Sequence, residues 1–299
     1  MDALSRLTRQ PSGEAALLLL LAAFILLRLV ALHGGRLLWE TARRLYNRIS
    51  AGSTWERTGG FINELRQRAP KVMGFLDARL TPRRFNGLPL TLLLLACAYA
   101  AGLYLEMVDE VLEAREVVVL DRAVNQALQP WRTPTAVAVF IWITNLGSVE
   151  TLTAVSIVST GFFFAFRRTG LALPLWVCIA GSQLTTWIGK YAIARPRPEF
   201  ILGVQAVSPS FPSAHATGSC AVYGFIAYAL VRHAKHARRR FEVSYWTAML
   251  VLLIAFSRVF LGVHFLSDVT AGLVVGGFWL LVGVALAEVM ARRESGRAK

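Results

Sequence analysis

Long apolar stretches alternate with short polar or basic segments along most of the chain. Seven of these stretches approach the roughly 20 residues that a helix needs to cross the hydrocarbon core of a bilayer, and each is bounded by charge, glycine or proline. They cover residues 15–32, 88–107, 148–166, 171–190, 213–232, 244–261 and 267–288. The pattern predicts an all-α protein, a polytopic membrane helix bundle in which one N-terminal helix precedes a six-helix core.

The same pattern divides the chain into three parts. Residues 1–87 are expected to form an anchor helix and a basic cytoplasmic loop, residues 88–288 the membrane core, and residues 289–299 a basic cytoplasmic tail. Arg28 lies within the first span, where a charge is costly unless it reaches the interface or pairs. That helix therefore either crosses the membrane or lies along its surface. Residues 133–146 are apolar but short, and we expect an amphipathic or re-entrant piece there on the outer face.

Charge is concentrated between the apolar stretches. The chain has a formal net charge of +14 and 55% hydrophobic residues, against roughly 45–50% in soluble domains. Basic clusters follow the first span, occur at Arg167 and from Arg232 to Arg240, and end the chain, which are the loops that the positive-inside rule assigns to the cytoplasm. We therefore interpret the positive charge as membrane topology and expect no nucleic acid partner. The outer loops are then residues 108–132, 191–212 and 262–266.

Polar and charged side chains form three groups at the ends of the predicted helices. The groups are Lys190, Arg195, Arg197 and Pro198, then Pro212, Ser213, Ala214 and His215, and finally Ser257, Arg258, His264 and Asp268. The first group ends one helix, the second begins the next, and the third joins the last two. Because consecutive membrane helices run in opposite directions, loop charge alone predicts that all three groups lie at the outer face.

An excess of cations is the first chemical indication. Lys190, Arg197 and Arg258 supply three positive donors, and the planar fork of arginine fits the oxygen atoms of phosphate. A helix that begins near Ser213 would add backbone N–H donors and the positive end of its dipole. Ser213 itself can cap that helix, bond a phosphate, or do both. Together these groups predict a site for an anionic, tetrahedral group.

Two histidines supply a nucleophile and a proton donor. His264 and Asp268 are four residues apart, a spacing that puts them on one face of a helical turn, so the carboxylate holds one ring nitrogen and leaves the other free to attack. His215 is then left as the general acid for the leaving oxygen, and it later helps to activate water.

Other polar residues have simpler interpretations. His33, His233 and His236 lie beside basic stretches, and we interpret them as unrelated to the site. Arg195 is interpreted as an interfacial charge next to Arg197. No carboxylate, histidine or cysteine cluster has the spacing of metal ligands, so we expect neither a metal nor a cofactor.

At these residues the sequence resembles the type 2 phosphatidic acid phosphatase family, lipid phosphate phosphatases that share a site with vanadium haloperoxidases. Its three-part signature has a lysine before an Arg-Pro pair, then Pro-Ser-Gly-His, then Ser-Arg followed by a histidine and an aspartate. The matching residues are Lys190, Arg197, Pro198, Pro212, Ser213, His215, Ser257, Arg258, His264 and Asp268. Ala214 replaces the usual glycine but keeps its backbone N–H, so we expect the site to function if this residue is near-helical.

The resemblance covers residues 88–288 and implies a metal-independent phosphatase that forms a phosphohistidine. It implies a substrate with a lipid-linked phosphate or diphosphate, such as undecaprenyl or another polyprenyl diphosphate or a phosphatidate-like lipid, in the plasma (inner) membrane with the site on the periplasmic face. The implied catalytic residues are His264, His215 and Asp268, and the implied phosphate-binding residues are Lys190, Arg197, Ser213, Ala214 and Arg258. Two alternatives stay open: a lipid phosphotransferase, and a non-catalytic transporter or scaffold for anionic lipid.

Overall fold

The structure of the protein is a computed structural model. It describes residues 25–30, 40, 41, 44, 64, 66–80, 87–113, 116–198 and 208–297, and the chain divides into two compact units, Met1–Leu92 and Leu93–Lys299. In the first unit, α4 (Pro70–Leu80) precedes Thr91, whose hydroxyl donates to the carbonyl oxygens of Arg79 and Gly87. Most of the predicted span at 15–32 lies outside the described residues, and residues 25–30 within it are helical.

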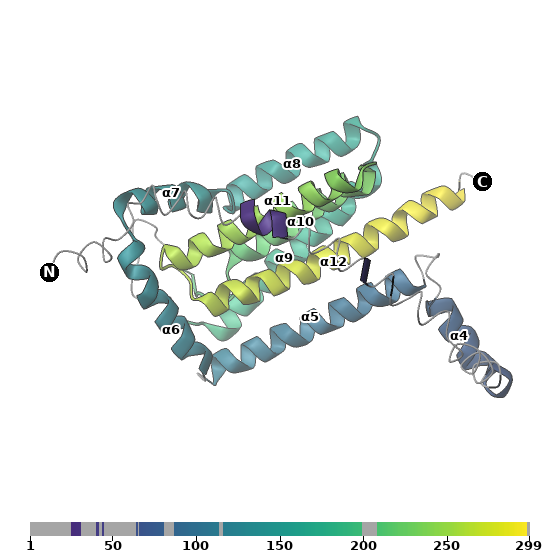
Figure 1. Cartoon of the computed structure of the whole chain (residues 1–299), viewed down its shortest axis with the longest axis horizontal. Coiled ribbons are helices and arrows are strands. Elements are labelled where there is room, and N and C mark those ends of the chain that lie inside the picture. The colour runs from purple at the N-terminus through teal and green to yellow at the C-terminus, as the bar shows by residue number, and fades with distance from the viewer. Residues whose placement is uncertain are drawn as a thin grey trace. The chain divides into compact units, whose positions relative to one another are not determined.

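Helices provide all the regular structure among the described residues, and Figure 1 shows their order along the chain. After α4 the elements are α5 (Leu88–Leu112), α6 (Glu116–Leu128), η1 (Gln129–Trp131), α7 (Pro134–Asn145), α8 (Val149–Ala165), η2 (Thr169–Leu171), α9 (Ala172–Ile193), α10 (Ala214–His233), α11 (Ala237–Phe260) and α12 (Leu266–Arg297). In the described part of the chain, five helices are long and apolar enough to cross a membrane, and the bent pair of α7 and α8 brings the number to six if it is one span. The predicted all-α membrane bundle is confirmed.

The segment before α8 is a short helix, which decides between the two alternatives expected for it. It is α7, a helix of 12 residues without a charged side chain, which begins at Pro134 after the N-cap Thr133. Of the two alternatives expected for residues 133–146, an amphipathic or a re-entrant piece, this uncharged apolar helix agrees with the re-entrant one. The chain bends by 41° between α7 and α8, and α8 restarts with Ser148 as its N-cap, whose hydroxyl accepts from the backbone N–H of Thr151. This geometry fits a broken span or a re-entrant loop.

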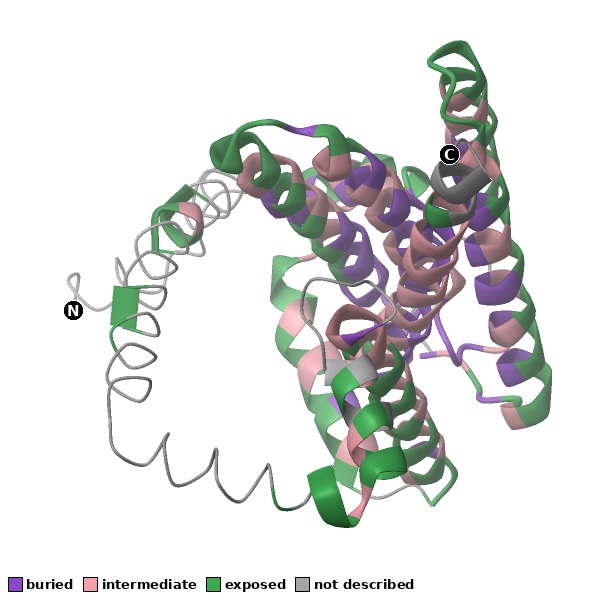
Figure 2. Ribbon diagram, turned by 90° about the vertical axis from the view of Figure 1, so that its right-hand side faces the viewer, coloured by how far each residue is buried: buried purple, intermediate pink, exposed green. Residues whose placement is uncertain are grey.

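α10 is the central helix of the bundle and contacts α8, α9, α11 and α12. Its buried residues near the start are small: Ala216, Thr217, Gly218 and Ser219. Small side chains let helix backbones approach closely, which is how helices associate where lipid leaves little hydrophobic driving force between them. Figure 2 shows the buried positions gathered along the helices of this bundle. The core is thus built around α10.

Two glycines of α12 bring its backbone against α10. A Cβ atom on Gly272 would lie 2.7 Å from the carbonyl oxygen of Ser213, and one on Gly276 would lie 2.6 Å from that of Thr217. The two helices are also joined where they begin, because the backbone N–H of Ser213 donates to the carbonyl oxygen of Asp268 (2.9 Å). Close packing of α10 and α12 therefore fixes the relative position of these two residues.

Two neighbouring glycines give a test of this packing. We expect Gly276→Ala to lower the free energy of unfolding by about 1–3 kcal/mol, because a methyl group forced into a filled space moves the backbone or its neighbours. Gly277→Ala is the matched control, since a Cβ there has no neighbour within 4 Å, and it should be neutral or slightly stabilising. Thermal unfolding of the purified proteins in detergent measures both. Equal melting temperatures for the two variants would contradict the packing.

Candidate active site

The three sequence groups meet at one end of the helix bundle. α9 and α11 finish at this end, and α10 and α12 begin there. α9 ends at Ala194, which is in the left-handed conformation (φ 49°) with its N–H bonded to the carbonyl oxygen of Lys190. This turn directs the chain with Arg195 and Arg197 back across the end of the bundle. The site is therefore made by the ends of four rigid helices.

The three predicted cations are held mostly by uncharged oxygen atoms. Lys190 Nζ donates to the carbonyl oxygen of Pro209. Arg197 donates from Nε to the carbonyl oxygen of Ser208 (2.8 Å) and from Nη1 to that of Val263 (2.7 Å). Carbonyl groups orient a cation without neutralising it, so the positive charge of both side chains stays available to an anion.

Arg258 is held by a contact with α7 that the sequence did not predict. Its Nη1 donates to the hydroxyl of Thr144 on α7 (2.8 Å), and the side chain is only 4% exposed. Its Nε has no hydrogen-bond partner among the described residues. Such an atom is rare in a folded protein and is usually explained by a ligand or by function. Sequence reasoning missed Thr144, because a threonine in an apolar helix carries no signal of its own.

Ser213 and Ala214 form the start of α10. Ser213 has the extended backbone of an N-cap residue, but its hydroxyl makes no capping bond, and Oγ is buried without a partner among the described residues. The capping role considered for Ser213 is therefore wrong, and the hydroxyl is available to a ligand. Ala214 is the first residue of α10 and is not among the residues with positive φ. Its conformation is thus the near-helical one in which alanine can replace glycine.

His264 and Asp268 face each other at the start of α12. His264 lies in the turn between α11 and α12, and Asp268 is in the first turn of α12. His264 Nδ1 is 3.5 Å from Asp268 Oδ2, longer than a normal hydrogen bond, although catalytic contacts often tighten only with substrate. The same Oδ2 accepts from the backbone N–H of Phe265 (2.9 Å). The expected pairing is therefore present as a contact rather than as a short hydrogen bond.

The other ring nitrogen of His264 faces the cations. Nε2 lies 3.2 Å from Arg197 Nη1. A guanidinium has no acceptor, so in this contact Nε2 must be the acceptor and Nδ1 must carry the ring proton. That tautomer directs the N–H to Asp268 and the lone pair of Nε2 toward Arg197. It is the arrangement that a nucleophilic imidazole requires.

Burial controls the protonation state of His264. Its pKa is lowered to about 3, mainly by desolvation and also by the positive charges of Arg258 and Arg197, while Asp268 acts in the opposite direction. Burial also lowers the pKa of the Arg197 guanidinium, and Asp268 opposes that shift. With a pKa near 3, His264 is neutral at physiological pH, so its Nε2 lone pair is not blocked by a proton.

His215 is the second residue of α10 and is partly buried. Its ring lies against the break between α7 and α8, since a Cβ on Gly147 would be 3.4 Å from His215 Cδ2. The charged or titratable groups that act on it are Arg258, His264, Arg197 and Lys190. His215 therefore shares the environment of the three cations from a different helix than His264.

Comparisons with known proteins show the family to which the chain belongs. The model of the PAP2 superfamily matches residues 171–290. Phosphatidylglycerophosphatase B of Bacillus subtilis (strain 168) is 33% identical over 190 residues, which are 63% of this chain and 89% of that protein. The chain belongs to the PAP2 superfamily. It is a membrane lipid phosphatase of the PAP2 type.

Two solved structures are similar to this PAP2 phosphatase. One is the crystal structure of a transmembrane PAP2-type phosphatidylglycerolphosphate phosphatase from Bacillus subtilis, with a TM-score of 0.60, 28% identity, and coverage of 64% of this chain and 96% of that one. The other is LpxE from Aquifex aeolicus, with a TM-score of 0.44, 23% identity, and coverage of 56% of this chain and 93% of that one. The family model, the Bacillus subtilis relative and the first of these two structures confirm the predicted family resemblance.

Arg195 was interpreted incorrectly from the sequence of this PAP2 phosphatase. It is not an interfacial charge: its side chain is 8% exposed and pairs with Asp268 Oδ1 (2.5 Å) and with Asp121 Oδ2 (2.8 Å). Asp121, assigned to an outer loop, is a buried residue of α6. The sequence contains one indication of this burial. Asp121 is a lone acidic residue on an apolar helix face, because the apolar Val117 lies four residues before it and Val124 three residues after it.

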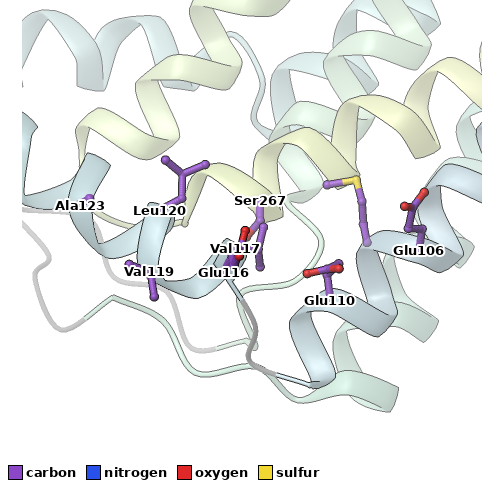
Figure 3. Close-up of a pocket in the computed structure, with 9 residues that line it drawn as sticks. Glu106, Glu110, Glu116, Val117, Val119, Leu120, Ala123 and Ser267 are labelled. Carbon is purple, nitrogen blue, oxygen red and sulfur yellow. The ribbon is translucent and has the colours of Figure 1, made fainter.

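A cavity of about 840 Å³ lies beside Ser267, and Figure 3 shows the side chains that line it. It is lined by Glu106 and Glu110 of α5, by residues of α6 that include Glu116, and by Ser267 of α12. His264, Lys190, Arg197 and Arg258 are not among the residues that line it. Among the described residues, no group of three His, Cys, Asp or Glu side chains can hold a metal ion.

The protonation state of His264 can be measured directly. We expect its imidazole to stay neutral, with the proton on Nδ1, from pH 8 down to about pH 5, because its pKa is lowered to about 3 from a usual value of about 6.5. Nitrogen-15 chemical shifts of histidine side chains report both the charge and the tautomer, and a His264→Asn sample assigns the signal. An imidazole that titrates between pH 6 and 7, or a proton on Nε2, would contradict the geometry.

Proposed function

We propose that this PAP2 phosphatase hydrolyses a lipid phosphate in two steps, transferring the phosphoryl group first to Nε2 of His264 and then to water. One observation carries the proposal, the charge balance of the site. Among the described residues of the site, the buried or half-buried cations outnumber the carboxylates by four to two: Lys190, Arg195, Arg197 and Arg258 against Asp121 and Asp268. A phosphate dianion matches this excess, and arginine is well suited to bind it.

Phosphate oxygens would be bound from several helices. Lys190, Arg197 and Arg258 provide positive charge that is already oriented, so little reorganisation is needed when charge develops in the transition state. The free Nε of Arg258 and the free hydroxyl of Ser213 are additional donors. The first backbone N–H groups of α10, with the positive end of its dipole, complete the set.

The chemical steps assign one role to each histidine. Nε2 of His264 attacks phosphorus and forms the N–P bond while the bond from phosphorus to the leaving oxygen breaks, and His215 gives that oxygen its proton. Water then attacks phosphorus, His215 takes a proton from the water, and the N–P bond breaks. Asp268 stays ionised and stabilises the positive charge that develops on the His264 ring.

The lipid substrate is supported by the membrane setting and by the relatives. Phosphatidylglycerophosphatase B is named for a glycerophospholipid with a terminal phosphate monoester, and a lipid of that class could keep its acyl chains in the bilayer while its phosphate reaches the end of the bundle. We therefore rank a lipid phosphate monoester first as the substrate. Polyprenyl diphosphate, the other substrate class expected from the family resemblance, is tested beside it.

The membrane face follows from the positions of basic residues. The opposite end of the bundle contains Arg167, Arg168, Arg232, His233 and the run from Arg238 to Arg240. Excess arginine and lysine marks cytoplasmic segments. The site then faces the outer, periplasmic side of the plasma (inner) membrane, where a substrate in the outer leaflet can enter.

Removal of the nucleophile tests the reaction. We expect His264→Asn to lower the release of phosphate by at least about 10³-fold, as loss of a nucleophile does in other enzymes. His233→Asn is the matched control, because His233 ends α10 at the opposite end of the bundle, and it should keep normal activity. The assay uses purified protein with phosphatidylglycerophosphate, phosphatidate, a polyprenyl diphosphate and a soluble phosphate ester, each with and without an acceptor lipid.

Each outcome of that assay has a meaning. Full activity of His264→Asn would refute the nucleophile, and label transferred mainly to the acceptor lipid would replace hydrolysis by phosphotransfer. Binding of lipid phosphate by the wild-type protein without turnover would favour the non-catalytic scaffold. Binding alone does not require the pairing of His264 with Asp268.

The leaving group tests the role of His215. With an alkyl phosphate, whose leaving oxygen needs a proton, we expect His215→Asn to slow turnover by about 10²–10⁴-fold. With p-nitrophenyl phosphate, whose leaving group is stable without a proton, the loss in the phosphorylation step should be much smaller. Rapid-quench measurement of that step compares the two substrates. An equal loss with both would mean that His215 binds phosphate rather than donating a proton.

A further inference from the structure

The carboxylate of Asp268 has different partners at its two oxygen atoms. Oδ2 faces His264 and accepts from the backbone N–H of Phe265. Oδ1 accepts from Nη1 of Arg195 (2.5 Å). The side chain that orients the nucleophile is therefore itself oriented by Arg195. The proposed two-step reaction does not use Arg195.

Arg195 is in turn held by a second carboxylate. Its Nη2 donates to Asp121 Oδ2 (2.8 Å), and its Nη1 also donates to the hydroxyl of Ser267 (2.8 Å). Asp121 accepts from Ser267 twice, at Oδ1 from the backbone N–H (2.9 Å) and at Oδ2 from the hydroxyl. The guanidinium also lies over the ring of Phe265, 4.5 Å from its centroid. Arg195 is thus fixed on several sides.

Burial makes this arrangement expensive. Asp121 is 2% exposed and Asp268 is fully buried, and an ionised group removed from water costs several kcal/mol unless its partners compensate. A buried ion pair is weak evidence for stability, because a pair of apolar residues often stabilises as well or better. The network is therefore better explained by what it does to Asp268.

The charge of the network explains why it has two carboxylates. If Arg195 faced Asp268 alone, the guanidinium would neutralise the negative charge that must stabilise a positive His264 ring. With Asp121 on its other side, the set of Arg195, Asp121 and Asp268 keeps one negative charge. Arg195 can then fix the position of Asp268 while the field at His264 stays negative.

We propose that Arg195 and Asp121 are positioning residues for the reaction. Arg195 holds the carboxylate of Asp268 beside His264, and the negative charge of Asp121 offsets the positive charge of Arg195, so that Asp268 is not neutralised. The inference rests on the proposed phosphohistidine mechanism. Neither residue belongs to the three-part signature of the family. Ser267 accepts from Arg195 and donates to Asp121. It also lines the cavity in Figure 3, together with residues of α5 and α6.

Asp121→Asn tests the proposal because it removes one negative charge and little volume. We expect kcat to fall by roughly 10–100-fold, as when an outer group that orients a reacting residue is lost, while KM stays within about twofold. The rate profile against pH should move to lower pH, because loss of negative charge makes nearby groups release protons more readily. The groups that act on His264 and His215 are Asp268, Arg258, Arg197 and Lys190.

Glu288→Gln is the matched control. Glu288 is on α12 at the other end of the bundle, where it accepts from Tyr228 Oη (2.6 Å) and pairs with Arg232. Like Asp121→Asn, this change turns a carboxylate that is paired with an arginine into an amide. Its kcat, KM and pH profile should equal those of the wild type. Ser267→Ala is a second variant if Asp121→Asn does not fold, and it should shift the profile in the same direction by less.

The pH profile separates positioning from a merely structural role. A smaller folded fraction scales the whole profile but does not move it along the pH axis. An unmoved profile in Asp121→Asn, or in Ser267→Ala if only that variant folds, would overturn the inference. If the wild-type protein releases no phosphate, the proposed function itself fails, and that result is distinct from an active wild type with an unmoved variant.

Discussion

Positive charge without a matching number of carboxylates, at the end of an apolar helix bundle, is the constraint on which the rest of the structure depends. Lys190 and Arg197 bond to carbonyl oxygens and Arg258 bonds to Thr144. Of these four cations, only Arg195 is paired with carboxylates in the part of the chain that the structure describes. A bundle that holds such charge must supply rigid oxygen acceptors, which here come from turns and helix ends.

Close packing between α10 and α12 connects the fold to this charge. Gly272 lets the backbone of α12 approach Ser213, and the bond from Ser213 N–H to the carbonyl of Asp268 joins the start of α10 to the residue that faces His264. Arg195, which follows α9, and Asp121 of α6 connect these two further parts of the chain to Asp268 of α12. Contacts between a few helices thus position the residues to which we assign phosphate binding, nucleophilic attack and orientation of the nucleophile.

Much of this could be predicted from sequence, because its signals are local. The alternation of apolar spans with basic loops predicts that the three groups lie at one end of the bundle, and the spacing of His264 and Asp268 predicts their contact. Arg195 and Asp121 could not be paired in this way, since 74 residues separate them and an arginine at a helix end usually anchors to the interface. The unpaired hydroxyl of Ser213 was also hidden, because an N-cap position normally predicts a capping bond.

Trapping of the phosphorylated enzyme tests the central claim most directly. Acid-labile phosphohistidine survives a rapid alkaline quench, so the protein can be mixed with labelled substrate, quenched and digested, and the modified peptide sequenced by mass spectrometry. The account predicts phosphate on Nε2 of His264, formed within one turnover and absent from the His264→Asn protein. Phosphate on His215, or turnover with no phosphoenzyme at any time under conditions that preserve phosphohistidine, would contradict it.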